Sequence, residues 1–343
     1  MAELLRNRRW TLKRRPNGIP VPDDFELVHD TIDPDALPPG HVLVRNMVTL
    51  CAPDQRNWMN EKVNFHPPMA LGDTVSSPNV SRIVASTHPD YTPGMVSFTM
   101  GGWCDYALLD VAKLYVPLVP YPEGTDPIKA IGVLGMNQLA AYFGMVKVGE
   151  PKPGDLLVVS GAAGSTGSAA AQIGKIKGCT VVGIAGGAEK CAWLREECGL
   201  DDVIDYKAED VAAVLAERYH NRIDIYFDNV GMPLLQAAFD NMAPNGRIAL
   251  CGMLANYPGY GDMPGPSNFM RIVHGAIKMQ GFIAVRWRDE IPAALAEIKG
   301  WIDAGLFKHR EDVRDGLENL PAIFPELFTG GNRGTLLVRL ADS

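Results

Sequence analysis

The chain has 343 residues, of which 47% are hydrophobic and 21% are charged, and its formal net charge is −8. That length is enough for two ordinary domains, each with its own hydrophobic core. An acidic balance argues against binding along a nucleic-acid backbone, which requires a basic face. No apolar run reaches the roughly 18 to 20 residues of a membrane-spanning helix. We therefore expect a globular protein that binds neither nucleic acid nor a membrane.

The first third of the chain reads as a series of short strands. Apolar, β-branched runs occupy residues 41–50, 81–86, 95–100 and 103–109, and Pro and Gly separate them. A Trp-x-Leu alternation near residue 10 suggests an earlier strand. Short strands separated by turn residues are typical of a compact β-rich domain, which we place at residues 1–127.

From about residue 128 the pattern changes to strands that alternate with helices. Residues 189–199 and 233–243 have helical spacing. Buried strands are predicted at 156–160, 180–185, 202–206, 224–230, 247–252 and 279–285. Alternation over this length predicts an α/β fold with a doubly wound parallel sheet, the Rossmann arrangement, over residues 128–287.

The last segment contains an amphipathic helix at 289–307 and a short strand at 334–340. Because the α/β unit is already complete before this point, we expect residues 288–343 to return to the β-rich domain. The predicted domains are therefore 1–127 with 288–343, and 128–287.

A glycine-rich turn connects the first strand of the α/β region to its helix. Gly161, Gly164 and Gly167 follow "LLVVS" and precede "GSAAAQIGKIKG". Glycines let the backbone approach a pyrophosphate, whose charge is favoured at a helix N-terminus. The strand–turn–helix context predicts a dinucleotide site. The alternative is a tight turn whose small residues serve packing only.

The end of the second strand indicates which dinucleotide would bind. NAD-binding proteins carry an acid there that bonds a ribose hydroxyl, but this chain has Ala185, Gly186 and Gly187. Two glycines leave room for a 2′-phosphate, Lys190 can pair with it, and Tyr206 can donate a hydrogen bond to it. The pattern favours NADP(H). The alternative makes Lys190 a solvated surface lysine that has no part in binding.

The cysteines and histidines do not form a recognisable metal site. The six cysteines are scattered, without a C-x-x-C pair, and we expect them to be reduced thiols. Cys51 has no ligand partner nearby in the sequence. A zinc site needs three or four ligands in register, and we expect none.

Several phrases together resemble one protein family. They include "NRRWTLKRRP", "GCTVVGIAGGAEKC", "FDNVG", "CGMLANY", "MQGF" and "DGLENLPAIF". The chain is similar to the medium-chain dehydrogenases/reductases, in the zinc-independent branch of prostaglandin and alkenal double-bond reductases. The resemblance implies a GroES-like first domain, a cytoplasmic homodimer, and NADPH-dependent reduction of the C=C bond of α,β-unsaturated ketones or aldehydes.

The resemblance also implies individual site residues. The family's cofactor contacts match the glycine loop, the 2′-phosphate partners and a set near the nicotinamide. In this sequence they are Gly164, Ser165, Thr166, Gly167, Lys190, Tyr206, Asn229, Cys251, Gly252, Phe282, Ile283, Ala284 and Asn332.

Two segments that lie on the substrate side in relatives depart from the family pattern. The family's S-x-D-P-Y-M-R is "TLCAPDQR" here, so that Asp54 replaces an aromatic residue. The family's "GMPGLTAY" is "GMNQLAAY", with Asn137 and Gln138 in place of Pro and Gly. We expect Asp54 and Asn137 near the substrate, where an acid would favour small or polar enones; the alternative makes Asp54 a solvated loop acid.

The reaction needs hydride at the β-carbon and a proton at the α-carbon, while negative charge develops on the carbonyl oxygen. In this fold the Tyr257 hydroxyl and a ribose hydroxyl of the cofactor are the candidate donors to that oxygen. Tyr260 lies in the same loop and is the rival of Tyr257. A quinone reductase, or a non-enzymatic use of the fold, is the alternative function.

Overall fold

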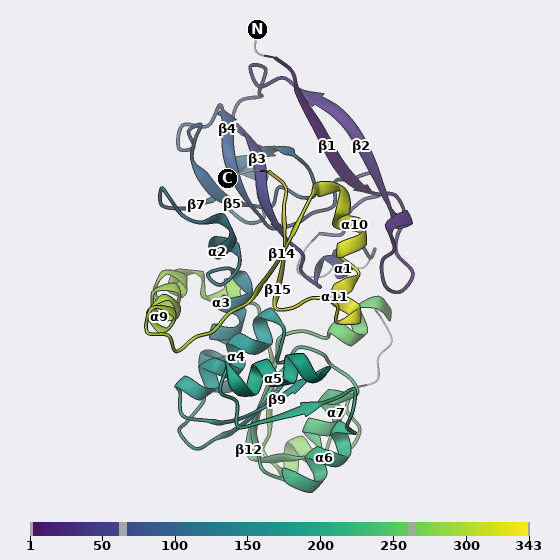
Figure 1. The fold of residues 1–343 in the computed structure, drawn as a ribbon, viewed down its shortest axis with the longest axis vertical. Helices are drawn as coiled ribbons and strands as arrows, with labels where there is room; N and C mark the ends of the chain where they lie inside the picture. Colours follow the sequence, from purple (N-terminus) through teal and green to yellow (C-terminus); the bar gives the residue numbers. More distant parts are fainter. Residues whose placement is uncertain (1–2, 62–66, 260–264, 342–343) are drawn as a thin grey trace. The chain divides into compact units, whose positions relative to one another are not determined.

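In the computed structural model, which describes residues 3–61, 67–259 and 265–341, a six-stranded parallel sheet lies at the centre of residues 133–310 (Figure 1). The strand order is β10-β9-β8-β11-β12-β13. The strands are β8 (Leu156–Ser160), β9 (Thr180–Ala185), β10 (Asp202–Asp205), β11 (Ile223–Asp228), β12 (Met242–Leu250) and β13 (Lys278–Gly281). This is the doubly wound order of dinucleotide-binding folds, and it confirms the α/β prediction.

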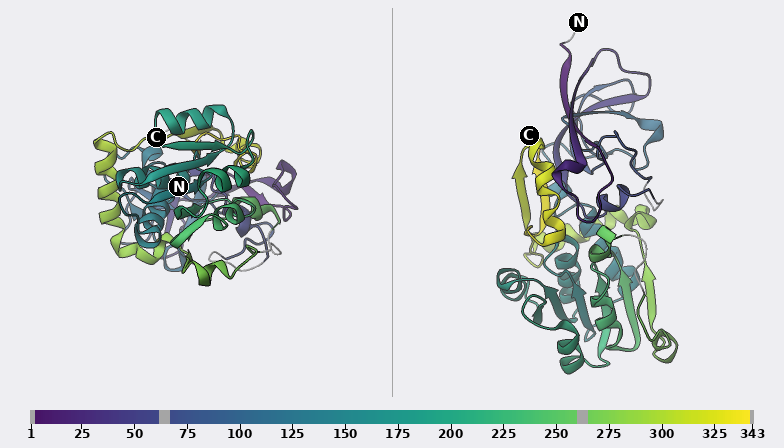
Figure 2. Two further views of the ribbon diagram at one scale, coloured as in Figure 1. Left: turned by 90° about the horizontal axis from the view of Figure 1, so that it is seen from below. Right: turned by 90° about the vertical axis from the view of Figure 1, so that its right-hand side faces the viewer.

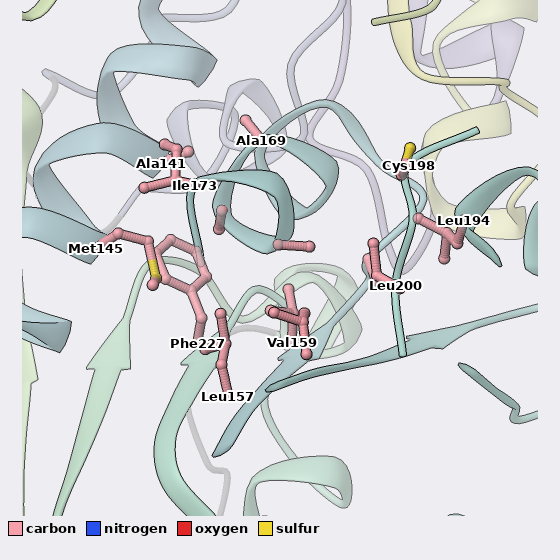
Figure 3. Close-up of a cluster of buried hydrophobic side chains, with 14 of the residues drawn as sticks. Ala141, Met145, Leu157, Val159, Ala169, Ile173, Leu194, Cys198, Leu200 and Phe227 are labelled. Carbon is pink, nitrogen blue, oxygen red and sulfur yellow. The ribbon is translucent and has the colours of Figure 1, made fainter. Parts of the chain in front are cut away.

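Helices cover both faces of this sheet. They are α3 (Met136–Phe143), α4 (Ser165–Ile176), α5 (Ala188–Glu196), α6 (Val211–Arg218), α7 (Leu234–Phe239), α8 (Arg271–His274) and α9 (Ile291–Asp303), with the π-helical turn η3 (Gly144–Gly149) and the 3-10 turns η4 (Leu254–Gly259) and η5 (Ala284–Glu290). Strand residues alternate between the two faces. Leu157, Val159 and Phe227 face α4 and η3, and Figure 3 shows Phe227 beside Met145. Val158 and Tyr226 face α6 and α7.

The β-rich unit comprises residues 1–132 and 311–343. Its strands are β1 (Leu5–Leu12), β2 (Phe25–Ile32), β3 (His41–Leu50), β4 (Asn79–Ser86), β5 (Val96–Thr99), β6 (Tyr106–Asp110), β7 (Val119–Pro120), β14 (Glu311–Asp315) and β15 (Thr335–Arg339). The larger sheet runs β14-β15-β3-β4-β5-β7, with β6 also paired to β3, and β1 pairs with β2. This is the β-rich domain that the sequence predicts.

Short helices complete the β-rich unit. They are α1 (Gln55–Trp58), α2 (Pro127–Ile131), α10 (Leu320–Ile323) and α11 (Glu326–Thr329), with the 3-10 turns η1 (Pro22–Asp24), η2 (Val111–Lys113) and η6 (Leu317–Asn319). Trp103 is fully buried against Phe25 and Phe324, at ring-centroid distances of 5.2 and 5.5 Å. β15 pairs antiparallel with β3, so the C-terminal segment lies beside the early strands of the same unit (Figure 2).

The boundaries between the two units differ from the domain boundaries predicted from the sequence. The units divide at residues 132/133 and 310/311, rather than at 127/128 and 287/288. α9 therefore belongs to the α/β unit, because its apolar face packs on Leu139 and Phe143 of α3 and Glu297 accepts a 2.5 Å hydrogen bond from the Tyr142 hydroxyl. The strand predicted at 279–285 is also shorter, since β13 ends at Gly281.

Candidate active site

The turn between β8 and α4 has a shape that requires glycine at two positions. Gly161 has a φ of +59°, and a Cβ at Gly167 would lie 2.2 Å from the Gly161 carbonyl oxygen. The Gly164 amide donates to that same oxygen at 3.0 Å. Helix α4 then begins at Ser165, with Thr166 and Gly167 in its first turn, where the helical backbone leaves amide N–H groups without intrahelical partners. This cradle fits a pyrophosphate.

At the end of β9, where an NAD-binding protein carries an acid, the space beside Gly187 is open, whereas Tyr206 fills the space beside Gly186. Gly187 has a φ of +94°, and a Cβ there would meet no atom within 4 Å. A Cβ at Gly186 would lie 2.5 Å from the Tyr206 ring, which therefore packs directly on this glycine. Lys190 is half-buried in the first turn of α5. Asp205, the nearby acid, accepts a 2.8 Å hydrogen bond from the Gly187 amide and so holds the turn.

A buried network joins the ends of β8, β11 and β12. The Ser160 carbonyl accepts from Asn229 Nδ2 at 2.7 Å, and the Ser160 hydroxyl accepts from the Asn229 amide at 2.9 Å. The Asp228 carbonyl accepts from the amides of Cys251 and Gly252. The expected contacts Asn229, Cys251 and Gly252 therefore converge at one edge of the sheet.

Asp228 is a residue of this region that sequence reasoning missed. Its side chain is fully buried, and Oδ1 accepts from the hydroxyls of Ser160 and Tyr226 and the amides of Val230 and Gly231. Burial raises the pKa of its carboxyl group. The signal in the sequence is an acid at the end of the apolar run "IYF". In the structure, the Asp228 side chain holds the turn at Asn229–Gly231.

Tyr257 lies in η4, after β12, and is half-buried. Its hydroxyl oxygen accepts a hydrogen bond from the Met253 amide at 3.3 Å. A Cβ at Gly252 would lie 3.0 Å from the same oxygen. The hydroxyl thus lies against the backbone at the end of β12. Tyr260, the rival candidate, lies outside the described residues.

The segment after β13 contains three expected cofactor contacts, but most of their side chains are packed inside the unit. The Phe282 ring packs in the core, 6.1 Å from the Phe227 ring, and a Cβ at Gly144 would lie 2.3 Å from it. Ala284 is buried, while Ile283 is 37% exposed. Of these three expected cofactor contacts, only Ile283 presents an exposed side chain.

Two expected site residues belong to the β-rich unit. Asn332 precedes β15, and its Nδ2 donates to the Gly334 carbonyl at 2.8 Å. Asp54 precedes α1 and is half-buried, and desolvation raises its carboxyl pKa to about 6. The neighbouring Gln55 is fully buried and bonds the Ala52 amide and the Ser76 carbonyl. The unusual glutamine of "CAPDQR" is therefore structural.

The second unusual segment begins α3. Asn137 is half-buried, whereas Gln138 is 2% exposed and its Nε2 donates to the Ser165 hydroxyl at 3.2 Å. Gln138 thus contacts the glycine turn, although the sequence pattern places it with Asn137 on the substrate side.

In the part of the chain that the structure describes, cysteines and other potential metal ligands do not cluster. None of the six cysteines, all of which lie within the described residues, forms a disulfide, and all but Cys251 are buried. Burial raises the pKa of the Cys51 and Cys104 thiols. Over residues 3–61, 67–259 and 265–341, no group of three His, Cys, Asp or Glu side chains could hold a metal ion.

Comparison with known families matches both halves of the chain. Residues 8–116 match a family described as the N-terminal domain of oxidoreductase, and residues 165–300 match one described as zinc-binding dehydrogenase. The chain is 38% identical to the NADPH-dependent curcumin reductase of Escherichia coli K12 over 342 residues, which is 98% of this chain and 97% of that protein. It is 33% identical to the NADP(+)-dependent 2-alkenal reductase of Nicotiana tabacum, covering 99% of each.

This chain belongs to the medium-chain dehydrogenase/reductase superfamily, in the branch of the prostaglandin, alkenal and curcumin reductases. A solved structure agrees with this assignment. CurA from Vibrio vulnificus in complex with NADPH has a TM-score of 0.90 and 34% identity, and the match covers 98% of this chain and 100% of that one. The medium-chain reductase resemblance inferred from the sequence is confirmed.

Proposed function

We propose that this medium-chain reductase uses NADPH to reduce the C=C bond of α,β-unsaturated ketones or aldehydes. The observation that carries the cofactor choice is the end of β9, where Gly186, Gly187 and Lys190 stand instead of a carboxylate and the space beside Gly187 is open. An acid there would repel a 2′-phosphate, whereas a lysine attracts it. The relatives whose names specify NADPH and alkenal or curcumin reduction support the reaction.

The residues of the α/β unit that would hold NADPH lie near the carboxyl ends of the parallel strands, and Asn332 of the β-rich unit is a further expected contact. The α4 N-terminus and its glycine turn would take the pyrophosphate, Lys190 and Tyr206 the 2′-phosphate, and the segments after β11, β12 and β13 the nicotinamide half. When bound, NADPH supplies the hydride.

The chain's own contribution to the chemistry is electrostatic. As the β-carbon gains hydride, electron density moves onto the carbonyl oxygen of the substrate, and a fixed donor there lowers the barrier. Tyr257 is the proposed donor, because its hydroxyl lies against the backbone at the end of β12, beside Gly252, where the nicotinamide half is expected. The α-carbon then takes a proton from water, and no side chain acid is needed.

We propose further that the protein is a cytoplasmic homodimer. β13 ends the sheet order at one side, and an unpaired edge can pair with another chain. Among the described residues, no helix has the length and hydropathy to cross a membrane.

A spectrophotometric assay tests the reaction directly. NADPH oxidation is followed with an enone, with a quinone and without an acceptor, and product analysis establishes whether the C=C bond has been reduced. Turnover with the enone and a saturated ketone product supports the proposal. Turnover with the quinone alone would instead support a quinone reductase, and no turnover with either acceptor would support a non-enzymatic role.

A further inference from the structure

Gln138 carries a buried hydrogen-bond acceptor that the protein does not satisfy. The residue lies in the first turn of α3 and is 2% exposed. Its Nε2 donates to the Ser165 hydroxyl at 3.2 Å, but its Oε1 is buried and has no hydrogen-bond partner among the described residues. Buried polar groups in folded proteins are almost always paired, so this acceptor calls for a donor from outside the chain.

A second buried glutamine shows what a satisfied side chain looks like in this unit. Gln172 on α4 is also 2% exposed. Its Nε2 donates to the Ser168 and Lys308 carbonyls, and its Oε1 accepts from the Lys308 amide at 2.6 Å. Gln172 therefore serves the fold, whereas Gln138 is anchored at only one end.

The position of α3 indicates which donor could reach Gln138. Ser165 is the first residue of α4, beside the proposed pyrophosphate cradle. Gly144, directly after α3, packs against Phe227 at the end of β11 and Phe282 after β13. α3 thus lies on the side of the β11 to β13 segments, and Lys190 and Tyr206 lie at the β9 and β10 end of the sheet. A pyrophosphate has only acceptors, while the nicotinamide ribose and carboxamide have donors.

We propose that Gln138 is a cofactor-binding residue whose Oε1 accepts a hydrogen bond from a hydroxyl or amide donor on the nicotinamide half of the bound dinucleotide, while its Nε2 holds Ser165. The inference rests on the proposed function for the presence of a dinucleotide. It also gives a role to a residue in which the chain departs from the glycine that its family usually carries.

Binding of two ligands separates this contact from other effects. Isothermal titration calorimetry with NADP+ and with 2′,5′-ADP, which lacks the nicotinamide half, is carried out on the wild type and on Gln138→Met. We expect NADP+ to bind about fivefold to thirtyfold more weakly to the variant, and 2′,5′-ADP to bind as before. Unchanged NADP+ affinity, or equal weakening of both ligands, would overturn the proposal.

The ligand-free protein gives a second, independent readout. Because methionine removes an unsatisfied acceptor, Gln138→Met should keep or raise the melting temperature without ligand. Gln172→Met, the matched control, should lower that temperature and leave the ratio of the two affinities unchanged. A Gln138→Met protein that melts well below the wild type would show that Oε1 has a partner within the fold, which contradicts the proposal. If that variant does not fold, Gln138→Gly, the family's residue, replaces it in the calorimetry.

The same experiments distinguish failure of the contact from failure of the proposed function. A wild type that binds neither ligand would overturn both. A wild type that binds NADP+ and shows the expected Gln138→Met pattern, but reduces no enone, would contradict only the proposed reaction.

Discussion

Lys190 is the single charge on which the proposed preference for NADPH depends most. We expect Lys190→Ala to weaken NADPH binding about tenfold to hundredfold, because a charge-assisted hydrogen bond to the 2′-phosphate is lost. NADH affinity should not change. Calorimetry with both cofactors measures this, and Lys175→Ala is the control, since Lys175 pairs with Asp201 at 2.8 Å on the same unit. Equal kcat/KM of the wild type for NADH and NADPH would show that the assignment is wrong.

Tyr257 tests the proposed chemistry. Tyr257→Phe keeps the ring and removes the hydroxyl, and we expect kcat on an enone to fall about tenfold to hundredfold, because a ribose hydroxyl and water partly replace the lost donor. NADPH affinity should stay near the wild-type value. Tyr260→Phe is the control from the same loop. Full kcat in Tyr257→Phe, or a change in KM alone, would remove this residue from the transition state.

The raised carboxyl pKa of Asp54 should make the stability of the folded protein depend on pH. Its carboxyl pKa is raised to about 6 by desolvation, so the folded protein binds a proton more tightly than the unfolded chain, whose ordinary value is about 4. This contribution to stability is complete below pH 4 and is lost as the pH rises to 6. We expect Asp54→Asn to melt higher than the wild type at pH 7, and the difference to shrink at pH 4. The exposed Asp289→Asn is the control, and a difference independent of pH would contradict the shift.

At the scale of single elements, the glycine turn between β8 and α4 tolerates the least change in side-chain size. A methyl group at Gly167 would lie 2.2 Å from the Gly161 carbonyl oxygen, so Gly167→Ala must displace the turn from α4. We expect a loss of about 1–3 kcal/mol in stability and weaker binding of NADP+, measured by thermal unfolding and calorimetry.

A glycine without that constraint is the control for the same substitution. Gly300 lies inside α9, and a Cβ there meets nothing within 4 Å. Gly300→Ala should raise stability by about 0.5–1 kcal/mol, because alanine favours the helix, and leave NADP+ binding unchanged. If both substitutions affected binding alike, the strain at Gly167 would not be its cause.

At the scale of the whole molecule, the exposed apolar side chains near the edge strand support a dimer. Phe269, Met270 and Val273 are at least 55% exposed, and this segment leads into β13. We expect light scattering at micromolar concentration to give about twice the chain mass of 37.2 kDa. Val273→Glu should shift the protein toward a monomer, whereas Leu306→Glu, at another exposed apolar position, should not. A wild-type monomer at that concentration would contradict the assembly.

The fold could be predicted from the sequence because its signals are local. Apolar strands alternate with helical segments, and each glycine of the turn stands next to the strand and helix that it connects. Such patterns depend on residues a few positions apart. The family resemblance rests on similarly short phrases, and it too is confirmed. The roles of the individual site residues, from Asp54 to Asn332, stay predictions.

What only the tertiary structure decided concerns residues that are distant in the chain. The Gln138 contact with Ser165 spans 27 positions, and the Ser160 contact with Asp228 spans 68. The packing of α9 on α3, which places α9 in the α/β unit, joins residues still further apart, since Tyr142 and Glu297 are separated by 155 positions. Whether a buried polar group finds a partner depends on the side chains that folding brings around it. The sequence alone therefore determined the architecture and the kind of site, while the buried networks that shape the site came from packing.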